Sequence, residues 1–182
     1  MTFEKTVTLK DGRNCLLRNG VTSDGKAVLD VFNRTHEETD YLLTYSDENC
    51  FTASQEADFL QRKTDSANNV EIIAVVDGVV AGTAGIDALG MRDKIKHRAV
   101  FGIAITKEFW GLGIGKYLME ACIECAREAG YLQLELEVVA ENERAVEMYR
   151  RAGFIEYGRN PKAFRLRTGE YQELIDMRLE LK

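Results

Sequence analysis

The chain has 182 residues, of which 45% are apolar, so it is long enough for one domain with a sizeable core. Its net charge of -6 argues against binding to nucleic acid and against attraction to anionic membranes, whereas a cationic ligand is compatible. The N-terminus lacks an apolar signal segment, and no apolar run approaches the roughly 20 residues that span a bilayer. We therefore expect a cytoplasmic protein with a single domain over residues 1–182.

Turn residues divide the first half of the chain into short elements. Asp11-Gly12 interrupts one pair of apolar runs and Asp77-Gly78 hinges another, which is typical of antiparallel hairpins. Between them, two segments have helical patterns, and the residues that join these helices include several acids. The expected elements are hairpins at 7–19 and 71–84 and helices at about 24–39 and 54–63.

The run from Ala99 to Thr106 is almost wholly apolar, which predicts a central strand that is buried on both faces. It leads into a glycine-rich turn, GLGIGK, over residues 111–116. A helix should follow, because apolar residues then recur at helical spacing up to Gly130, which predicts its C-terminal end. The apolar stripe consists of Ile114, Leu118, Ala121, Cys125 and Ala129.

Glycines at the start of a helix let backbone N–H groups approach an anion, and the helix dipole favours a phosphate there. The phosphate loop of ATPases does not fit, since its first glycine would fall on Trp110 and its Ser/Thr on Tyr117. A dinucleotide fingerprint would need a third glycine where Lys116 stands, although Glu135 lies at about the right distance for a ribose-binding acid. That second interpretation stays open.

Polar residues alternate with apolar ones along the strand expected at 132–139. Glu135 and Glu137 share one face, and a strand covered on both sides should not place two carboxylates on one face. That face should therefore open into a cleft. Asn142 is placed to cap the next helix, whose stripe includes Tyr149.

Two further strands are expected at 154–158 and at about 174–181, and the second could supply a sheet edge for pairing with a second copy of the chain. Among the four cysteines, Cys122 and Cys125 fall on or beside the helical stripe and have no second pair that would complete a zinc site. We expect them to pack in the core and expect no metal.

The segment from about Val70 to Phe154 resembles the GCN5-related N-acetyltransferase (GNAT) superfamily. The resemblance rests on the run from Ile105 to Gly115, LELEV, Asn142, Ala145, Met148-Tyr149 and Gly153-Phe154. It implies an α/β fold with a mixed, mostly antiparallel central sheet of six to seven strands and helices on both faces. One position departs from the family pattern, because Trp110 stands where the family usually has Gln or Arg.

In that family the loop amides hold the pyrophosphate of coenzyme A, and the preceding strand pairs with the pantetheine arm. The resemblance therefore implies acetyl-CoA as cosubstrate. It also implies the coenzyme-binding residues Ile103, Ala104, Ile105, Gly111, Leu112, Gly113, Ile114, Gly115, Lys116, Asn142, Ala145 and Tyr149.

The implied reaction needs a base for the amine and an acid for the departing thiolate. Tyr149 corresponds to the family's usual acid, and Glu137 matches the base of the ribosomal-protein N-terminal acetyltransferase branch. Glu135 and Asp87 are the other candidate bases. A backbone N–H where the strand Ile103 to Ile105 parts from its neighbour would stabilise the tetrahedral oxyanion.

The expected function is direct transfer of an acetyl group from acetyl-CoA to a primary amine, on a small molecule or a protein N-terminus. In the family the region between the first two helices covers the acceptor, so acids there would favour a cationic substrate; they are Glu37, Glu38, Asp40, Asp47 and Glu48. A coenzyme A-binding module without turnover is the alternative, and a nicotinamide-dependent oxidoreductase is a third interpretation. A homodimer is also conceivable.

Overall fold

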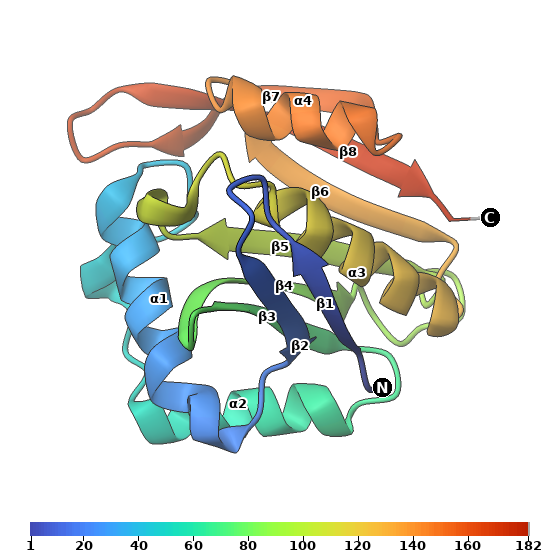
Figure 1. The fold of residues 1–182 in the computed structure, drawn as a ribbon. Helices are drawn as coiled ribbons and strands as arrows, with labels where there is room; N and C mark the ends of the chain where they lie inside the picture. Colours follow the sequence, from blue (N-terminus) through green and yellow to red (C-terminus); the bar gives the residue numbers. More distant parts are fainter. Residues whose placement is uncertain (182) are drawn as a thin grey trace.

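The computed structural model describes residues 1–181, and one mixed sheet runs through them (Figure 1). Its strand order is β1-β2-β3-β4-β5-β6-β8-β7, and every neighbouring pair is antiparallel except β5 and β6. This confirms the expected mixed, mostly antiparallel sheet, although it has eight strands rather than the expected six to seven. The eight strands are β1 (Glu4–Thr8), β2 (Asn14–Asn19), β3 (Val70–Val76), β4 (Val79–Ala88), β5 (Arg98–Ile105), β6 (Gln133–Val139), β7 (Ile155–Arg165) and β8 (Tyr171–Glu180).

Helices cover both faces of the sheet, as expected. α1 (Gly25–Glu38) and α2 (Ala53–Asp65) pack on one face around a small core that includes Leu60 and Ile73. α3 (Ile114–Glu128) and α4 (Glu143–Arg151) lie on the other face, over the main core. Three short 3₁₀ turns complete the chain, η1 (Thr22–Asp24), η2 (Ser46–Glu48) and η3 (Lys107–Phe109). None of the helices within residues 1–181 is long and apolar enough to cross a bilayer.

Helix α3 follows the predicted pattern closely. It begins after Gly113, and Gly130 beyond its end has φ of 81°, a left-handed value that suits glycine at a helix C-terminus. The side chains of Cys122 and Cys125 are fully buried in the main core, so their place in the apolar stripe is confirmed as packing.

Strand β5 is not buried on both faces, contrary to the sequence prediction. Val100 is 39% exposed, Gly102 is exposed, and a Cβ at Gly102 would meet no atom within 4 Å. The side chains of Phe101, Ile103 and Ile105 pack in or against the main core, so only the opposite face is open. An apolar run shows that a strand is central, but it does not show where the helix layer above it stops.

The C-terminal strand is not an edge of the sheet either. β8 lies between β6 and β7, with Val138 opposite Ile175 on one side and Gly158 opposite Asp176 on the other. The edge strand on this side is β7. The chain forms β7 first, at the edge, and then turns back to place β8 between β7 and β6 (Figure 1). The expected pairing edge therefore belongs to β7.

A buried group of charged residues lies between α2 and the β3–β4 hairpin. The carboxylate of Glu71 is 14% exposed, and the ammonium of Lys63 lies 3.9 Å from its Oε2 and 2.5 Å from Oδ2 of Asp87. Burial is the main influence on Glu71 and raises its pKa to about 7, while Lys63 opposes this effect and the carboxylates of Asp87 and Glu56 add to it. Glu71 therefore keeps its proton in the folded state up to a pH of about 7.

This burial predicts how stability depends on pH. The pKa of Glu71 rises from 4.5 in the unfolded chain to about 7 in the fold, so between these values the folded state binds more protons. The contribution of protonated Glu71 to the stability of the fold is therefore fully present below pH 4.5 and is lost as the pH rises through 7. Between pH 5 and pH 8, the free energy of unfolding of Glu71→Gln, measured in urea, should therefore rise relative to that of wild type by up to about 3 kcal/mol.

The control for Glu71→Gln is Glu124→Gln, on the exposed face of α3. Its stability difference from wild type should not change over the same pH range. A Glu71→Gln difference that is equally constant would contradict the assignment.

Candidate active site

The site begins where β5 and β6 separate. These parallel strands pair only between Arg98–Val100 and Gln133–Glu135. Beyond these residues β5 continues to pair with β4 as far as Ile105, and β6 pairs with β8 as far as Val139. Beyond the last paired residues, the backbone N–H and C=O groups on the facing edges of β5 and β6 therefore form no hydrogen bonds with each other. The resulting gap in the strand pairing lies where the sequence analysis expected the strand to part.

The glycine loop, residues 111–115, lies at the N-terminus of α3. Gly111 and Gly113 have φ of 85° and 96°, values that favour glycine. Within residues 1–181, the N–H groups from Gly111 to Gly115 donate no hydrogen bond to the protein. A run of free amides at a helix N-terminus is suited to an anion.

Gly115 has a different role from Gly113. A Cβ at Gly115 would lie 3.1 Å from Sδ of Met148 and 3.4 Å from Cδ1 of Ile105. Glycine here lets α3 come close to α4 and β5, so a larger residue would push the walls of the gap apart. Gly113 instead has only ordinary contacts around its Cβ position and is fixed by its left-handed backbone.

Trp110, the departure from the family pattern, closes the turn after β5. Its indole N–H donates to the carbonyl oxygen of Ile105 at 2.7 Å. The guanidinium of Arg144, in the first turn of α4, lies 5.1 Å from the centre of the Trp110 ring. Trp110 therefore links the end of β5 to the start of α4.

Tyr149 lies in the main core on the α3/α4 face of the sheet, beside Phe101 of β5. Asn142 caps α4, since its Oδ1 accepts from the backbone N–H of Ala145 at 3.3 Å, which confirms the predicted cap. The ring of Tyr149 meets Phe101 edge-on, with 6.1 Å between the ring centroids, and Phe101 is the first residue of β5 after the pairing with β6 ends. The side chain is 6% exposed, and this burial raises its pKa well above the usual value for tyrosine.

Glu137 lies on the opposite face. Leu136 and Val138 belong to the main core with Tyr149, so the alternation of β6 places Glu137 on the other side of the sheet. The side chain of Glu137 is exposed and forms no hydrogen bond or ion pair with the side chains or backbone of the described residues. It stands two residues beyond the last pairing of β6 with β5. The acid and the base expected from the sequence thus lie on the two sides of one gap.

The other two candidate bases are already paired. Glu135 is 8% exposed and is bound in a two-point ion pair by Arg98, with Nη2 at 2.7 Å from Oε2. Asp87 lies 2.5 Å from Lys63. Of the three candidate bases, Glu137 is therefore the one whose carboxylate has no cationic partner among the described residues.

Asp176 is a further acid at this site that the sequence analysis did not identify. It lies directly opposite Glu137 across the β6–β8 pair, so the two side chains share a face. It also lies against Gly158 of β7, where a Cβ would come within 2.7 Å of its Oδ2. The only signal in the sequence is the alternation of polar residues in β8, because the pairing register that brings Asp176 to Glu137 is not local.

Two of the five acids that were expected to favour a cationic acceptor have cationic partners. Glu38 accepts from the backbone N–H of Lys107 at 2.5 Å and pairs with Arg34. Asp47 forms a two-point ion pair with Arg167, at 3.0 and 2.8 Å. These contacts weaken the expectation that the acidic run itself selects a cationic acceptor.

A small pocket of about 160 Å³ lies between the α1–α2 segment (residues 39–52) and the β7–β8 hairpin. Polar and apolar side chains share its walls, and Asp40 and Arg165 add one charge of each sign. The pocket is closed on one side by Arg167, whose backbone N–H donates to the Tyr45 hydroxyl at 3.0 Å. The lining residues are Thr39, Asp40, Leu42, Leu43, Thr44, Tyr45, Ala163, Phe164, Arg165 and Leu166.

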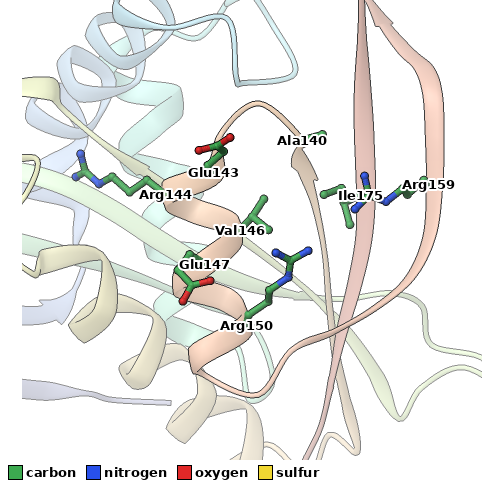
Figure 2. A pocket seen from close by; sticks show the side chains of 8 residues that line it. All are labelled: Ala140, Glu143, Arg144, Val146, Glu147, Arg150, Arg159 and Ile175. Carbon is green, nitrogen blue, oxygen red and sulfur yellow. The ribbon is translucent and has the colours of Figure 1, made fainter.

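A larger pocket of about 670 Å³ lies on the outer side of α4, against β7 and β8 (Figure 2). Its two inward arginines are paired with acids: Arg150 lies 3.4 Å from Glu156, and Arg159 contacts Glu156 and Glu173. Arg144 extends away from this pocket, towards the side on which it meets Trp110 (Figure 2). None of the described residues that line the larger pocket belongs to β5 or β6.

Comparison with known proteins identifies the family of this fold and site. The family model described as "Acetyltransferase (GNAT) family" matches residues 30–154. The L-amino acid N-acetyltransferase AaaT of Escherichia coli is 32% identical over 118 residues, which is 64% of this chain and 72% of that protein. The chain belongs to the GNAT acetyltransferase family.

Solved structures agree with this assignment. The acetyltransferase of the GNAT family from Streptococcus pneumoniae superposes with a TM-score of 0.87 at 28% identity, over 91% of this chain and 99% of the other. The structure of yncA, a putative acetyltransferase from Salmonella typhimurium with its cofactor acetyl-CoA, gives a TM-score of 0.82 at 17% identity, over 93% and 95% of the two chains. This second likeness shows the shared fold.

Proposed function

We propose that this protein transfers an acetyl group from acetyl-CoA directly to a primary amine. The observation that carries the proposal is the gap between β5 and β6, which has Tyr149 on one face of the sheet and Glu137 on the other. An amine and a thioester could meet in this gap from opposite sides. Direct transfer needs only this proximity and a proton acceptor and donor, and no acetylated residue of the protein is required.

The groups present fit coenzyme A. The free N–H groups of the glycine loop would hold the pyrophosphate, and the unpaired edge of β5 from Ile103 to Ile105 would bind the amide-rich pantetheine arm. Asn142 and Ala145, at the start of α4, would line the opposite wall. When bound, acetyl-CoA supplies an activated acyl group as a thioester.

Glu137 is the proposed base. A primary amine has a pKa near 10 and arrives mostly as an ammonium ion, so its proton must be removed before the nitrogen can attack. An exposed carboxylate without a partner can accept that proton directly or through water. Asp176 beside it adds a second negative charge, which favours the approach of a cation.

Tyr149 is the proposed acid. Burial keeps its phenol protonated throughout the neutral pH range, so a proton is available for the departing thiolate. A higher phenol pKa makes Tyr149 a weaker acid. The same low-polarity surroundings, however, also raise the pKa of the thiol that the departing thiolate forms. The two groups can therefore remain matched for proton transfer, provided that they come within hydrogen-bond distance.

The pocket between the α1–α2 segment and the β7–β8 hairpin is the proposed binding place for the rest of the acceptor. Glu38, at the end of α1, accepts a hydrogen bond from the backbone N–H of Lys107, just after β5. Gln172, in the β7–β8 hairpin, lies two residues beyond Val139–Leu174, the last pair of β6 and β8. The pocket is therefore next to the end of the gap. Mixed polar and apolar walls with one acid and one arginine suit an amino acid or the first residue of a peptide. The similarity to AaaT, an L-amino acid N-acetyltransferase, supports the amino acid.

Thermal unfolding in the presence of acetyl-CoA, coenzyme A, NAD and ATP tests the ligand class. A ligand at 100 times its dissociation constant stabilises a protein by about 2.7 kcal/mol. We expect both coenzyme A compounds to raise the midpoint and NAD and ATP to leave it unchanged. A shift with NAD alone would contradict the proposal and support the nicotinamide interpretation.

Replacing Glu137 with glutamine tests the base. We expect kcat with the best amine to fall by about 10²- to 10⁴-fold, because the amide cannot accept the proton. Coenzyme affinity should not change, because Glu137 lies on the other face from the glycine loop. The measurement is steady-state kinetics from pH 6 to 9.

The matched control is Glu141→Gln, an exposed acid in the turn between β6 and α4. It should retain full activity. If Glu137→Gln behaved in the same way, another carboxylate or water would have to be the base.

A further inference from the structure

The turn of the β1–β2 hairpin is fastened to the glycine loop. The backbone N–H of Lys10 donates to the carbonyl oxygen of Leu112 at 3.2 Å. The hydroxyl of Tyr117, in the first turn of α3, donates to the carbonyl oxygen of Thr8 at 3.2 Å. Two hydrogen bonds thus fix a segment from the start of the chain against the N-terminus of α3 (Figure 1).

The side chain of Lys10 lies beside Gly113. Both its Cγ and its Cε are 3.9 Å from the Cβ position of that glycine, so the aliphatic stem runs along the loop. The ammonium group is one bond beyond Cε. It therefore sits close to the backbone N–H groups that form the proposed anion site.

The charge on Lys10 has no acidic partner among residues 1–181. Asp11, its neighbour in the turn, is bound by Arg13 at 2.8 Å, and Arg13 also pairs with Asp77 at 3.2 Å. Lys116, on α3, lies 3.7 Å from Glu120. Lys10 is therefore an uncompensated cation beside a loop whose amides already attract negative charge.

We propose that Lys10 binds a phosphate group of the coenzyme, so that the N-terminal hairpin forms part of the coenzyme site. This rests on the proposed function, which brings a coenzyme with a pyrophosphate and a ribose 3′-phosphate to the loop. Either phosphate offers the same anionic oxygens to an ammonium group. The contact would anchor the coenzyme through a residue outside the glycine loop.

The test is isothermal titration calorimetry of wild type, Lys10→Met and Lys10→Arg with coenzyme A and 3′-dephospho-coenzyme A. We expect Lys10→Met to raise Kd for coenzyme A by about 5- to 20-fold and Lys10→Arg to restore most of the affinity, because methionine keeps the stem without the charge. Lys5→Met, an exposed lysine on β1 of the same hairpin, is the control and should bind like wild type.

The second ligand shows which phosphate is bound. If the loss disappears with 3′-dephospho-coenzyme A, Lys10 binds the 3′-phosphate, and if the loss is equal for both ligands it binds the pyrophosphate. An unchanged Kd in Lys10→Met overturns the inference and leaves the proposed function intact. Equal weakening in the Met and Arg variants with a lower melting temperature also overturns it, because the role would then be structural. Failure of wild type to bind either ligand contradicts the proposed function itself.

Discussion

Replacing Tyr149 with phenylalanine should lower kcat by about 10²- to 10³-fold and leave the fold intact. The ring would keep its contacts with Phe101 and Phe154, whose centroids lie 6.1 and 5.8 Å away, so the only loss is the hydroxyl group. Without it, the thiolate must take its proton from water in a site that the main core largely closes off. The Kd for coenzyme A should change little.

The loss in Tyr149→Phe should also be nearly independent of pH between 6 and 9. Burial raises the pKa of Tyr149 far above this range, so the phenol does not titrate within it. The measurement is kcat across the pH range, with Tyr131→Phe, another buried tyrosine beyond the end of α3, as the control. Turnover in Tyr149→Phe equal to that of the control at every pH would refute the acid assignment.

Replacing Gly113 with valine should raise the Kd for coenzyme A at least tenfold. Gly113 has φ of 96°, and a left-handed backbone costs a non-glycine residue roughly 1–2 kcal/mol, with β-branched side chains among the least tolerant. The loop would relax away from this conformation, and the free N–H groups from Gly111 to Gly115 would then point in other directions. Calorimetric titration with coenzyme A measures the change.

Gly130→Val controls for the strain itself. Gly130 has φ of 81° at the other end of α3 and no atom within 4 Å of its Cβ position, so valine there should also lower stability but should not affect binding. The contrast between the two variants isolates the loop's role in binding. If both showed the affinity of wild type, the glycine loop would not be the anion site.

Local patterns were enough to predict the helices and most strands. The stripe of α3, the turn at Asp77-Gly78 and the cap at Asn142 each depend on residues a few positions apart, and the structure confirms all three. The face of β6 that carries Glu137 was likewise predicted from alternation.

The errors concern relations between distant segments. Whether β5 is covered on a given face depends on where α1 and β6 end, and the place of β8 inside the sheet depends on the order of pairing. The ion pair between Arg98 and Glu135, which are 37 residues apart in sequence, was likewise not predicted. Lys10 could not be placed at the glycine loop, because nothing near it in sequence indicates that its turn docks there.

The most direct test of the proposed activity is amine-dependent release of coenzyme A from acetyl-CoA, with the product identified by mass spectrometry. The amines should include apolar and charged L-amino acids, a short peptide with a free N-terminus and a polyamine. We predict that at least one amino acid or peptide gives an N-acetylated product in equal amount to the thiol released, and that omission of the amine abolishes release. Tight binding of acetyl-CoA without acetylation of any amine would contradict the activity and support a coenzyme A-binding module.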